Sequence, residues 1–341
     1  MMIAGMKKQP FIIILDIDKT IIGSIDIVVK ERALLEYIYN VCKKKGVSAK
    51  CPSMDLIDIQ DVLKEELLRP NVSDFINFCD KKFRNAEIFF YTNSAYAWTN
   101  DFIGKNLEKA LKIKINRPFF TRENSMNETM KKSLANIYPT IISTLAKRYP
   151  SLNDGDVAEY VLNNRTVFID DIKDNIFAYT NRQLVCPAYN YTPYYDIYER
   201  CITKYKMSPQ IFDDKDILKY MSDNTIPVYN INGNAWQKNK EYIALFNLYY
   251  TKHAEISKIK NASTGGAAGT YFKDLIAELL KKSVNAERLT DKNIMTLNTK
   301  LSIKTPKATK TVKDVKETKA TKKTKTVKEP KAPKKKPKAT K

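Results

Sequence analysis

The chain has 341 residues, of which 43% are hydrophobic, and it carries a formal net charge of +21 at pH 7. No apolar run approaches membrane-spanning length and the first residues lack the apolar core of a signal peptide, so we expect a cytoplasmic or nuclear protein that is neither secreted nor bound to a membrane. The five cysteines show no C-x-x-C spacing, and His253 is the single histidine. This composition argues against a zinc site, a His-rich metal site and catalysis by a histidine nucleophile.

The most informative segment is residues 11–20, which read FIIILDIDKT. Five consecutive apolar residues are typical of a strand buried on both faces of a parallel sheet. Asp16 and Asp18 follow directly, and side chains two residues apart on an extended chain point the same way. Both carboxylates are therefore predicted to lie beyond the carboxyl edge of the sheet, where open α/β sheets bind ligands. Two close carboxylates repel each other unless a cation or a shared proton neutralises them.

A second buried strand is predicted at Glu87–Tyr91, which is short, apolar and rich in aromatic residues. It ends at Thr92 and Asn93, whose hydroxyl and backbone N–H groups suit a phosphate oxygen. The simpler alternative for this cluster is an N-cap of the following helix. Further along, Lys131 and Lys132 offer an ammonium group that could neutralise phosphate and carboxylate charge.

A third buried strand is predicted at Thr166–Ile169, and Asp170 and Asp171 follow it directly. Acidic side chains at the ends of two parallel strands can converge on one Mg²⁺ ion, which prefers oxygen ligands. A charged run of this kind is otherwise a solvated loop. Its position directly after a buried strand favours the metal site.

Together these segments resemble the haloacid dehalogenase (HAD) superfamily, specifically the RNA polymerase II C-terminal-domain (CTD) phosphatases and the NLI-interacting-factor-like phosphatases. That family carries, in order, Arg-Pro-x-x-x-x-Phe-Leu, Phe-Thr-Ala-Ser, Phe-Arg-Glu, Lys-Asp-Leu and Val-Asp-Asn. The matching stretches here are Arg69–Ile76, Tyr91–Ser94, Thr121–Glu123, Lys132–Leu134 and Ile169–Asp171. The resemblance covers residues 8–205 and implies an α/β fold, a HAD-like, doubly wound parallel sheet of the Rossmann-like type.

The resemblance implies a phosphatase that forms an aspartyl-phosphate. Asp16 is the expected nucleophile, and Asp18 is the expected general acid and base. Thr92, Asn93 and Lys132 are expected to bind the phosphoryl oxygens. The order of the motifs places Lys132, rather than the lysine before it, at the catalytic position.

The resemblance also implies a Mg²⁺ cofactor. Its expected ligands are Asp16, the backbone carbonyl of Asp18, and Asp171, which replaces the family's Asn. Thr20 is expected to set the turn after the nucleophile, and Asp170 to support the site.

Two features depart from the family pattern. Lys19 stands where the family usually has Glu, which places an unexpected cation in the first motif. Residues 135–163 form a longer link than the family's, and we expect a helical insertion there. It is predicted to contain a helix over Tyr138–Lys147, a turn at Tyr149–Pro150 and a second short helix ending before Arg165.

Beyond the phosphatase domain at 8–205, the sequence predicts a helical and aromatic accessory segment at 206–260. Its Tyr242–Tyr250 stretch suits either packing against the core or a partner-binding surface. Residues 261–270 are small and Gly-rich, which predicts a flexible linker. Short helices are predicted over 271–300.

The last segment, 301–341, differs from the rest of the chain. Lysine occupies every third position from Lys304 to Lys334, and the segment holds 16 lysines against three acidic residues, a net charge of +13. It cannot bury a core, so we expect it to be disordered and to bind nucleic acid non-specifically. The alternative is a repeat that only aids solubility. Pro333–Lys338 resembles a nuclear import signal. The abundance of Lys, Asn, Ile and Tyr is typical of AT-rich coding genomes, such as those of large DNA viruses or of protists, and for a viral protein a host nucleus or a virion is the expected location.

Three functions follow from these observations. The first is a Mg²⁺-dependent Ser/Thr phosphoprotein phosphatase of the CTD-phosphatase type, whose substrate includes an RNA polymerase tail. The second is a phosphatase of nucleic-acid ends or nucleotides, because the same Asp-x-Asp-x-Thr chemistry serves those substrates. The third is a non-catalytic nucleic-acid-binding or virion protein that keeps the fold.

Overall fold

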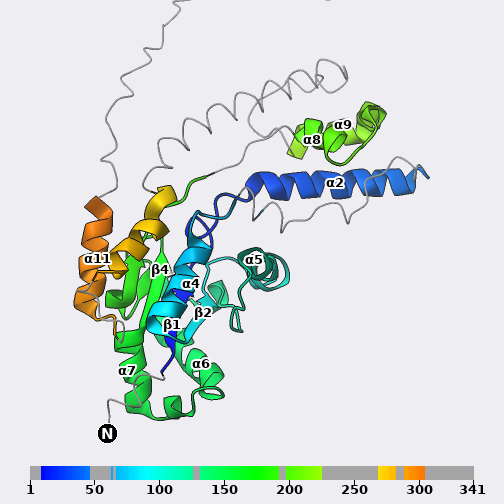
Figure 1. Cartoon of the computed structure of the whole chain (residues 1–341). Helices are drawn as coiled ribbons and strands as arrows, with labels where there is room; N and C mark the ends of the chain where they lie inside the picture. The colour runs from blue at the N-terminus through cyan, green and yellow to red at the C-terminus, as the bar shows by residue number, and fades with distance from the viewer. Residues whose placement is uncertain are drawn as a thin grey trace, which may run out of the picture. The chain divides into compact units, whose positions relative to one another are not determined.

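The structure is a computed structural model, and it describes residues 9–46, 63, 67–125, 131–191, 197–224, 268–281 and 288–303. A central sheet has the strand order β2-β1-β4-β6, and each neighbouring pair is parallel (Figure 1). Its strands are β1 (Phe11–Leu15), β2 (Ala86–Phe90), β4 (Thr166–Asp170) and β6 (Gln183–Val185). A second, two-stranded parallel sheet joins β3 (Lys132–Ser133) to β5 (Ile176–Phe177).

Helices cover both faces of the central sheet, as the alternation along β1 requires. Phe11, Ile13 and Leu15 belong to one hydrophobic cluster, which also contains residues of α2 (Asp26–Lys44), α4 (Val72–Phe83) and α5 (Gly104–Leu111). Ile12 and Ile14 belong to the other cluster, with residues of α6 (Leu134–Ala146) and α7 (Gly155–Arg165). The predicted fold class, an α/β doubly wound parallel sheet, is confirmed.

The predicted helical insertion between Lys132 and β4 is also present, with corrected bounds. Its first helix, α6, begins at Leu134 rather than Tyr138, because the Ser133 hydroxyl accepts the backbone N–H of Asn136 and caps the helix. The second helix, α7, includes Arg165 and runs directly into β4. Asp154 caps α7 by accepting the N–H of Asp156.

The remaining helical elements are short. The π-helical and 3-10 turns are η4 (Ala97–Ile103), η5 (Arg122–Asn124), η6 (Pro150–Asn153), η7 (Thr180–Arg182) and η8 (Pro209–Asp213). Within the described part of the chain after β6, the α-helices are α8 (Ile197–Thr203), α9 (Lys215–Asn224), a helix over residues 268–279 and α11 (Asp291–Ile303). Among the described residues, no helix combines the length and the apolar character that a membrane span needs.

Helix α11 packs against β6 at the edge of the central sheet. Asn298 of α11 lies along the edge strand β6, where its amide accepts the N–H of Val185 at 2.9 Å and donates to the carbonyl of Gln183 at 2.8 Å. This contact satisfies backbone groups that an edge strand would otherwise leave unpaired.

The predicted linker 261–270 needs a correction at its end. Residues 268–270 are helical and Ala268 is buried, because its carbonyl accepts a hydrogen bond from Arg69. Residues 261–267, the Tyr242–Tyr250 stretch and the Lys-rich segment after residue 303 lie outside the described residues.

Candidate active site

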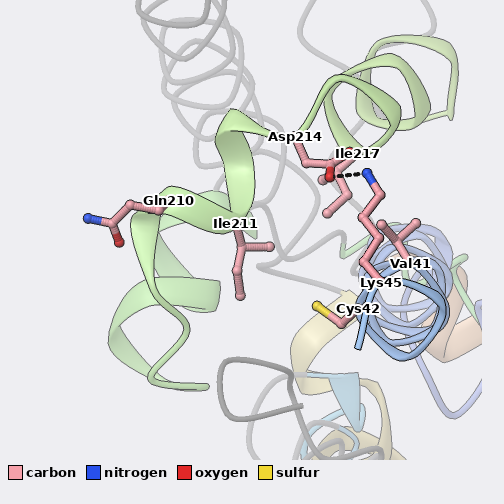
Figure 2. A pocket seen from close by; sticks show the side chains of 7 residues that line it. All are labelled: Val41, Cys42, Lys45, Gln210, Ile211, Asp214 and Ile217. Carbon is pink, nitrogen blue, oxygen red and sulfur yellow. Dashed lines mark hydrogen bonds and ion pairs between the residues drawn. The ribbon is translucent and has the colours of Figure 1, made fainter. Parts of the chain in front are cut away.

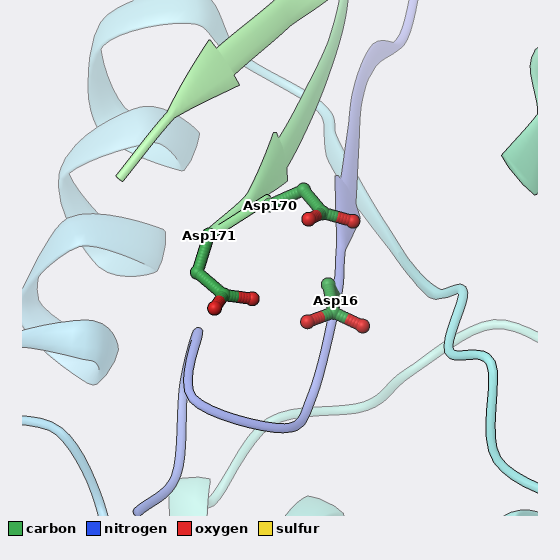
Figure 3. Close-up of side chains that lie close together, drawn as sticks. All are labelled: Asp16, Asp170 and Asp171. Atoms are coloured by element: carbon green, nitrogen blue, oxygen red, sulfur yellow. The ribbon is translucent and has the colours of Figure 1, made fainter. Parts of the chain in front are cut away.

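The carboxyl edge of the central sheet brings together side chains from β1 and β4. The N–H of Asp16 donates to the carbonyl of Ile169 at 2.9 Å, which extends the pairing of the two strands by one residue. Asp16 therefore lies opposite Asp170 and Asp171, and Figure 3 shows the three carboxyl groups around a shared space. One carboxylate oxygen of each residue lies within 4.8 Å of the others.

Lys132 reaches this cluster from the small sheet. Its ammonium group donates to Asp16 Oδ1 at 2.5 Å and to Asp170 Oδ2 at 2.7 Å, and the side chain is fully buried. The pairing of β3 with β5 holds the backbone in place, because the N–H of Lys132 donates to the carbonyl of Asn175. The neighbouring Lys131 is exposed. The structure thus places in the site the lysine that the motif order selected.

Thr20 connects the segment that carries Asp16 to the acidic residues at the end of β4. Its hydroxyl donates to Asp16 Oδ2 at 2.8 Å and accepts the N–H of Asp171 at 3.1 Å. The turn that returns Thr20 towards Asp16 passes through Lys19, whose φ of 58° lies in the left-handed region. Lys19 is exposed, so the unexpected lysine of the first motif contributes its backbone to the turn while its side chain lies at the surface.

Asp18 lies at the more open side of the site. The hydroxyls of Thr92 and Ser94 both donate to Asp18 Oδ2, at 3.3 and 3.0 Å. Thr92 and Ser94 follow the carboxyl end of β2. Their hydroxyls therefore lie at the same edge of the sheet as the first motif, as expected for parallel strands. Ser94 was not among the predicted site residues, although the sequence cluster Thr92-Asn93-Ser94 already indicated it.

Asn93 is placed differently from its neighbours. Its side-chain oxygen accepts the hydroxyl of Ser125 at 3.1 Å, and its backbone carbonyl accepts Arg122 Nε at 3.0 Å. The Asn93 side chain thus fastens the loop after β2 to the segment around η5.

Asp170 has a larger set of partners than a supporting role requires. Besides Lys132, it accepts the N–H of Ile172 at 2.7 Å and the side-chain amide of Asn175 at 3.0 Å. Asp170 is fully buried, whereas Asp171 is partly exposed. Asp170 therefore anchors the lysine, and Asp171 is the more accessible carboxylate of the pair. Asn175 is a further residue that the sequence patterns did not select.

The site carries more negative than positive charge. Three carboxylates, Asp16, Asp170 and Asp171, face one ammonium group, that of Lys132, so the fully ionised cluster has a net charge of −2. Burial raises the pKa of Asp16 to about 7, with repulsion from Asp170 adding to it and the attraction of Lys132 opposing it. Burial, followed by repulsion from Asp170, also raises the pKa of Asp171.

These residues fit a magnesium ion. The converging donors are carboxylate oxygens, which Mg²⁺ prefers, and a dication offsets negative charge that Lys132 alone does not balance. Asp16 and Asp171 are joined through Thr20, and Asp171 is the partly exposed member of the cluster, whereas Asp170 binds Lys132, Asn175 and the N–H of Ile172. The donor set therefore suits the expected ligands, Asp16 and Asp171.

The pKa of Asp16 predicts how stability depends on pH without magnesium. Between its unfolded value of 3.8 and its folded value of about 7, the folded state holds the proton more tightly than the unfolded state. Stability should consequently fall as the pH rises from 4 towards 8. Mg²⁺ favours the ionised carboxylate, so it should raise the melting temperature more at pH 8 than at pH 5. Thermal unfolding with Mg²⁺ or EDTA at both pH values measures this, and equal Mg²⁺ effects would contradict it.

A separate hollow of about 180 Å³ lies between α2, η8 and α9 (Figure 2). Apolar side chains of Val41, Ile211 and Ile217 line it, and an ion pair between Lys45 and Asp214 closes one side. None of the predicted site residues lines this hollow, so it is distinct from the carboxylate cluster.

No known family profile matches the chain, and no curated protein is similar to it. Two similar solved structures are those of "Fcp1, an essential RNA polymerase II CTD phosphatase" and of a variant of the fission yeast RNA polymerase II CTD phosphatase Fcp1 bound to beryllium fluoride. Each is 15% identical to this chain with a TM-score of 0.29. The first match covers 89% of this chain and 63% of that chain, and the second covers 76% and 68%. The chain therefore spans less than two thirds of the first structure's length, and a TM-score at this level does not establish a shared fold. The functional assignment rests on the side-chain geometry.

Proposed function

We propose that the chain is a Mg²⁺-dependent phosphatase of the HAD type, a phosphoric monoester hydrolase that forms an aspartyl-phosphate on Asp16. The observation that carries this proposal is the placement of Asp16. It is bound on one oxygen by Lys132 and on the other by Thr20, with a second carboxylate, Asp18, two residues further on. A buried carboxylate held by a fixed cation and a hydroxyl is suited to nucleophilic attack.

In the first step, an Asp16 oxygen attacks phosphorus and the bond from phosphorus to the leaving oxygen breaks. Asp18 gives its proton to that oxygen. In the second step, water attacks the phosphorus of the aspartyl-phosphate, Asp18 takes a proton from this water, and Asp16 and inorganic phosphate are released. The hydroxyls of Thr92 and Ser94 orient Asp18 for both transfers.

Positive charge assists this transfer from two sides. The ammonium group of Lys132 has three N–H donors and two carboxylate acceptors, so it keeps one donor for a phosphoryl oxygen. A Mg²⁺ ion held by Asp16, Asp171 and the backbone carbonyl of Asp18 would offset the charge on the transferring group.

For the substrate, we propose a phosphoserine or phosphothreonine in a protein, of the kind found in an RNA polymerase tail. The support is the ordered set of CTD-phosphatase landmarks, in particular Arg69–Ile76 and Thr121–Glu123. The basic segment 301–341 would then hold the enzyme near nucleic acid or phosphorylated partners.

Phosphate release from two substrates tests this proposal. One substrate is a phosphoserine heptad-repeat peptide, and the other is an oligonucleotide with a terminal phosphate, each assayed with Mg²⁺ and with EDTA. We expect Mg²⁺-dependent release from the peptide and none from the oligonucleotide. Release from the oligonucleotide alone would establish a nucleic-acid-end phosphatase instead. Failure to hydrolyse both, and an aryl phosphate as well, would reject the enzyme and favour a binding protein.

A further inference from the structure

Arg69 is a buried cation that is held by three separate parts of the chain. Its side chain is 1% exposed. The guanidinium donates from Nη1 to the carbonyl of Thr20 at 3.0 Å, from Nη2 to that of Pro187 at 2.9 Å, and from Nε to that of Ala268 at 2.8 Å. These carbonyls belong to the turn after the nucleophile, to the segment after β6 and to the helix over residues 268–279.

Aromatic rings surround the same guanidinium. Its Cζ lies 5.1 Å from the ring centre of Tyr271 and 5.5 Å from that of Phe272, both in the helix over residues 268–279. It lies 5.6 Å from the ring centre of Tyr189. Among the described residues, no carboxylate forms an ion pair with Arg69. Carbonyl dipoles and ring faces therefore balance its buried charge. The helix over residues 268–279 supplies two of the three rings.

The contact with Thr20 connects this arrangement to the chemistry. The Thr20 carbonyl accepts Arg69, while the Thr20 hydroxyl binds Asp16 and the N–H of Asp171. The backbone of Arg69 adds a further link, because its N–H donates to the carbonyl of Ile21 at 2.8 Å. Two groups of Arg69 thus hold the turn that orients the nucleophile.

We propose that Arg69 and the helix over residues 268–279 position the turn that follows Asp16 and contains Thr20. Through Arg69, this helix contributes to the geometry of the active site. Guanidinium N–H groups point in fixed directions in one plane. A displacement of the Ala268 carbonyl or of the aromatic rings consequently changes where Nη1 meets Thr20. Arg69 is a positioning residue, since it touches neither Asp16 nor the expected phosphoryl group.

Two substitutions test the proposal from its two sides. Arg69→Lys keeps the positive charge but loses the planar guanidinium group. Phe272→Leu removes one aromatic ring of the helix over residues 268–279. The first readout, which rests on the proposed function, is kcat and KM for an aryl phosphate with Mg²⁺. We expect Arg69→Lys to lower kcat about 10- to 100-fold, as for other residues that orient a reacting group without contacting the substrate. KM should stay within about twofold of the wild-type value. Phe272→Leu should change kcat in the same direction by less.

The second readout needs no activity. Hydrogen exchange of the peptide covering residues 16–22 reports on the turn, where the N–H groups of Thr20, Ile21 and Ile22 all donate to the carbonyl of Ile17. Both substitutions should increase exchange there at least about tenfold in the full-length protein. If the wild type hydrolyses nothing, the proposed phosphatase function fails, and the exchange data alone decide whether Arg69 positions the turn.

Matched controls come from the other end of the sheet. Arg165 is equally buried and donates to the carbonyls of Pro10 and Phe83, and Phe83 stacks on Phe11. Arg165→Lys and Phe83→Leu should lower the melting temperature but leave kcat and exchange in residues 16–22 unchanged. Equal effects of the Arg69 and Arg165 substitutions on these two readouts would overturn the proposal. Unchanged exchange at residues 16–22 in both Arg69→Lys and Phe272→Leu would do the same.

Discussion

Replacing Asp16 by Asn should abolish turnover, with kcat reduced by about 10⁴-fold or more, as expected for loss of a covalent nucleophile. An amide oxygen can still accept the Lys132 ammonium group, and the Thr20 hydroxyl can accept from the amide nitrogen, so the hydrogen bonds of the site can be kept. The fold should therefore survive. Single-turnover phosphate release and the melting temperature measure the two effects.

The same substitution should reduce the dependence of stability on pH. With Asp16 uncharged, the cluster retains two carboxylates and one ammonium group, so less repulsion remains at pH 8. The melting temperature without Mg²⁺ should then change less between pH 5 and pH 8 than it does in the wild type. Residual turnover within about tenfold of the wild type would contradict the assignment of Asp16 as nucleophile.

Replacing Lys132 by Met should produce the largest loss of stability of any single substitution in the site. Lys132 is the cation shared by Asp16 and Asp170, and all three side chains are buried. Burial alone would lower the pKa of Lys132, but the two carboxylates raise it above its ordinary value, so the ammonium form is favoured in the fold. Removing one partner from a buried ion pair costs about 3–5 kcal/mol, and denaturant unfolding measures it.

A double substitution tests whether the loss of stability comes from the uncompensated carboxylate charge rather than from the loss of catalysis. Lys132→Met combined with Asp170→Asn removes one uncompensated carboxylate and should regain part of the lost stability, while turnover remains absent. Lys131→Met is the matched control, since Lys131 precedes it in the chain and is exposed. We expect Lys131→Met to change neither the free energy of unfolding nor kcat. A Lys132→Met protein as stable as the wild type would show that the carboxylates do not depend on this cation.

The short sequence patterns predicted the buried strands and the acidic residues at their ends, because local composition determines these features. The apolar run before Asp16 is buried on both faces of the sheet, as its composition indicated. Asp170 and Asp171 at the end of β4 lie beside Asp16, because parallel strands end at the same edge. The start of α6 was predicted four residues late, at Tyr138, whereas the helix begins at Leu134 with Ser133 as its cap.

Contacts between distant parts of the chain were not predictable in the same way. Arg69 appeared in the sequence only as a landmark, because its carbonyl partners carry no side-chain signature and lie as far away as Ala268. The glycine-rich composition before Ala268 indicated a linker, yet residues 268–270 belong to a helix because tertiary contacts decide the structure there. Asn175 was missed because it acts through Asp170.

The distance along the chain between Arg69 and Ala268 also sets the order in which the protein can mature. The two residues are 199 positions apart. Ribosomes add about 5–20 residues per second, so about 10–40 s pass between synthesis of the arginine and synthesis of its last carbonyl partner. The strand that carries Asp16 is complete long before this. A nascent chain, or one terminated before residue 268, can therefore pair its β-strands while the turn that contains Thr20 still lacks the contact between Arg69 and Ala268, and the full set of Arg69 partners forms only after residue 268 has been added.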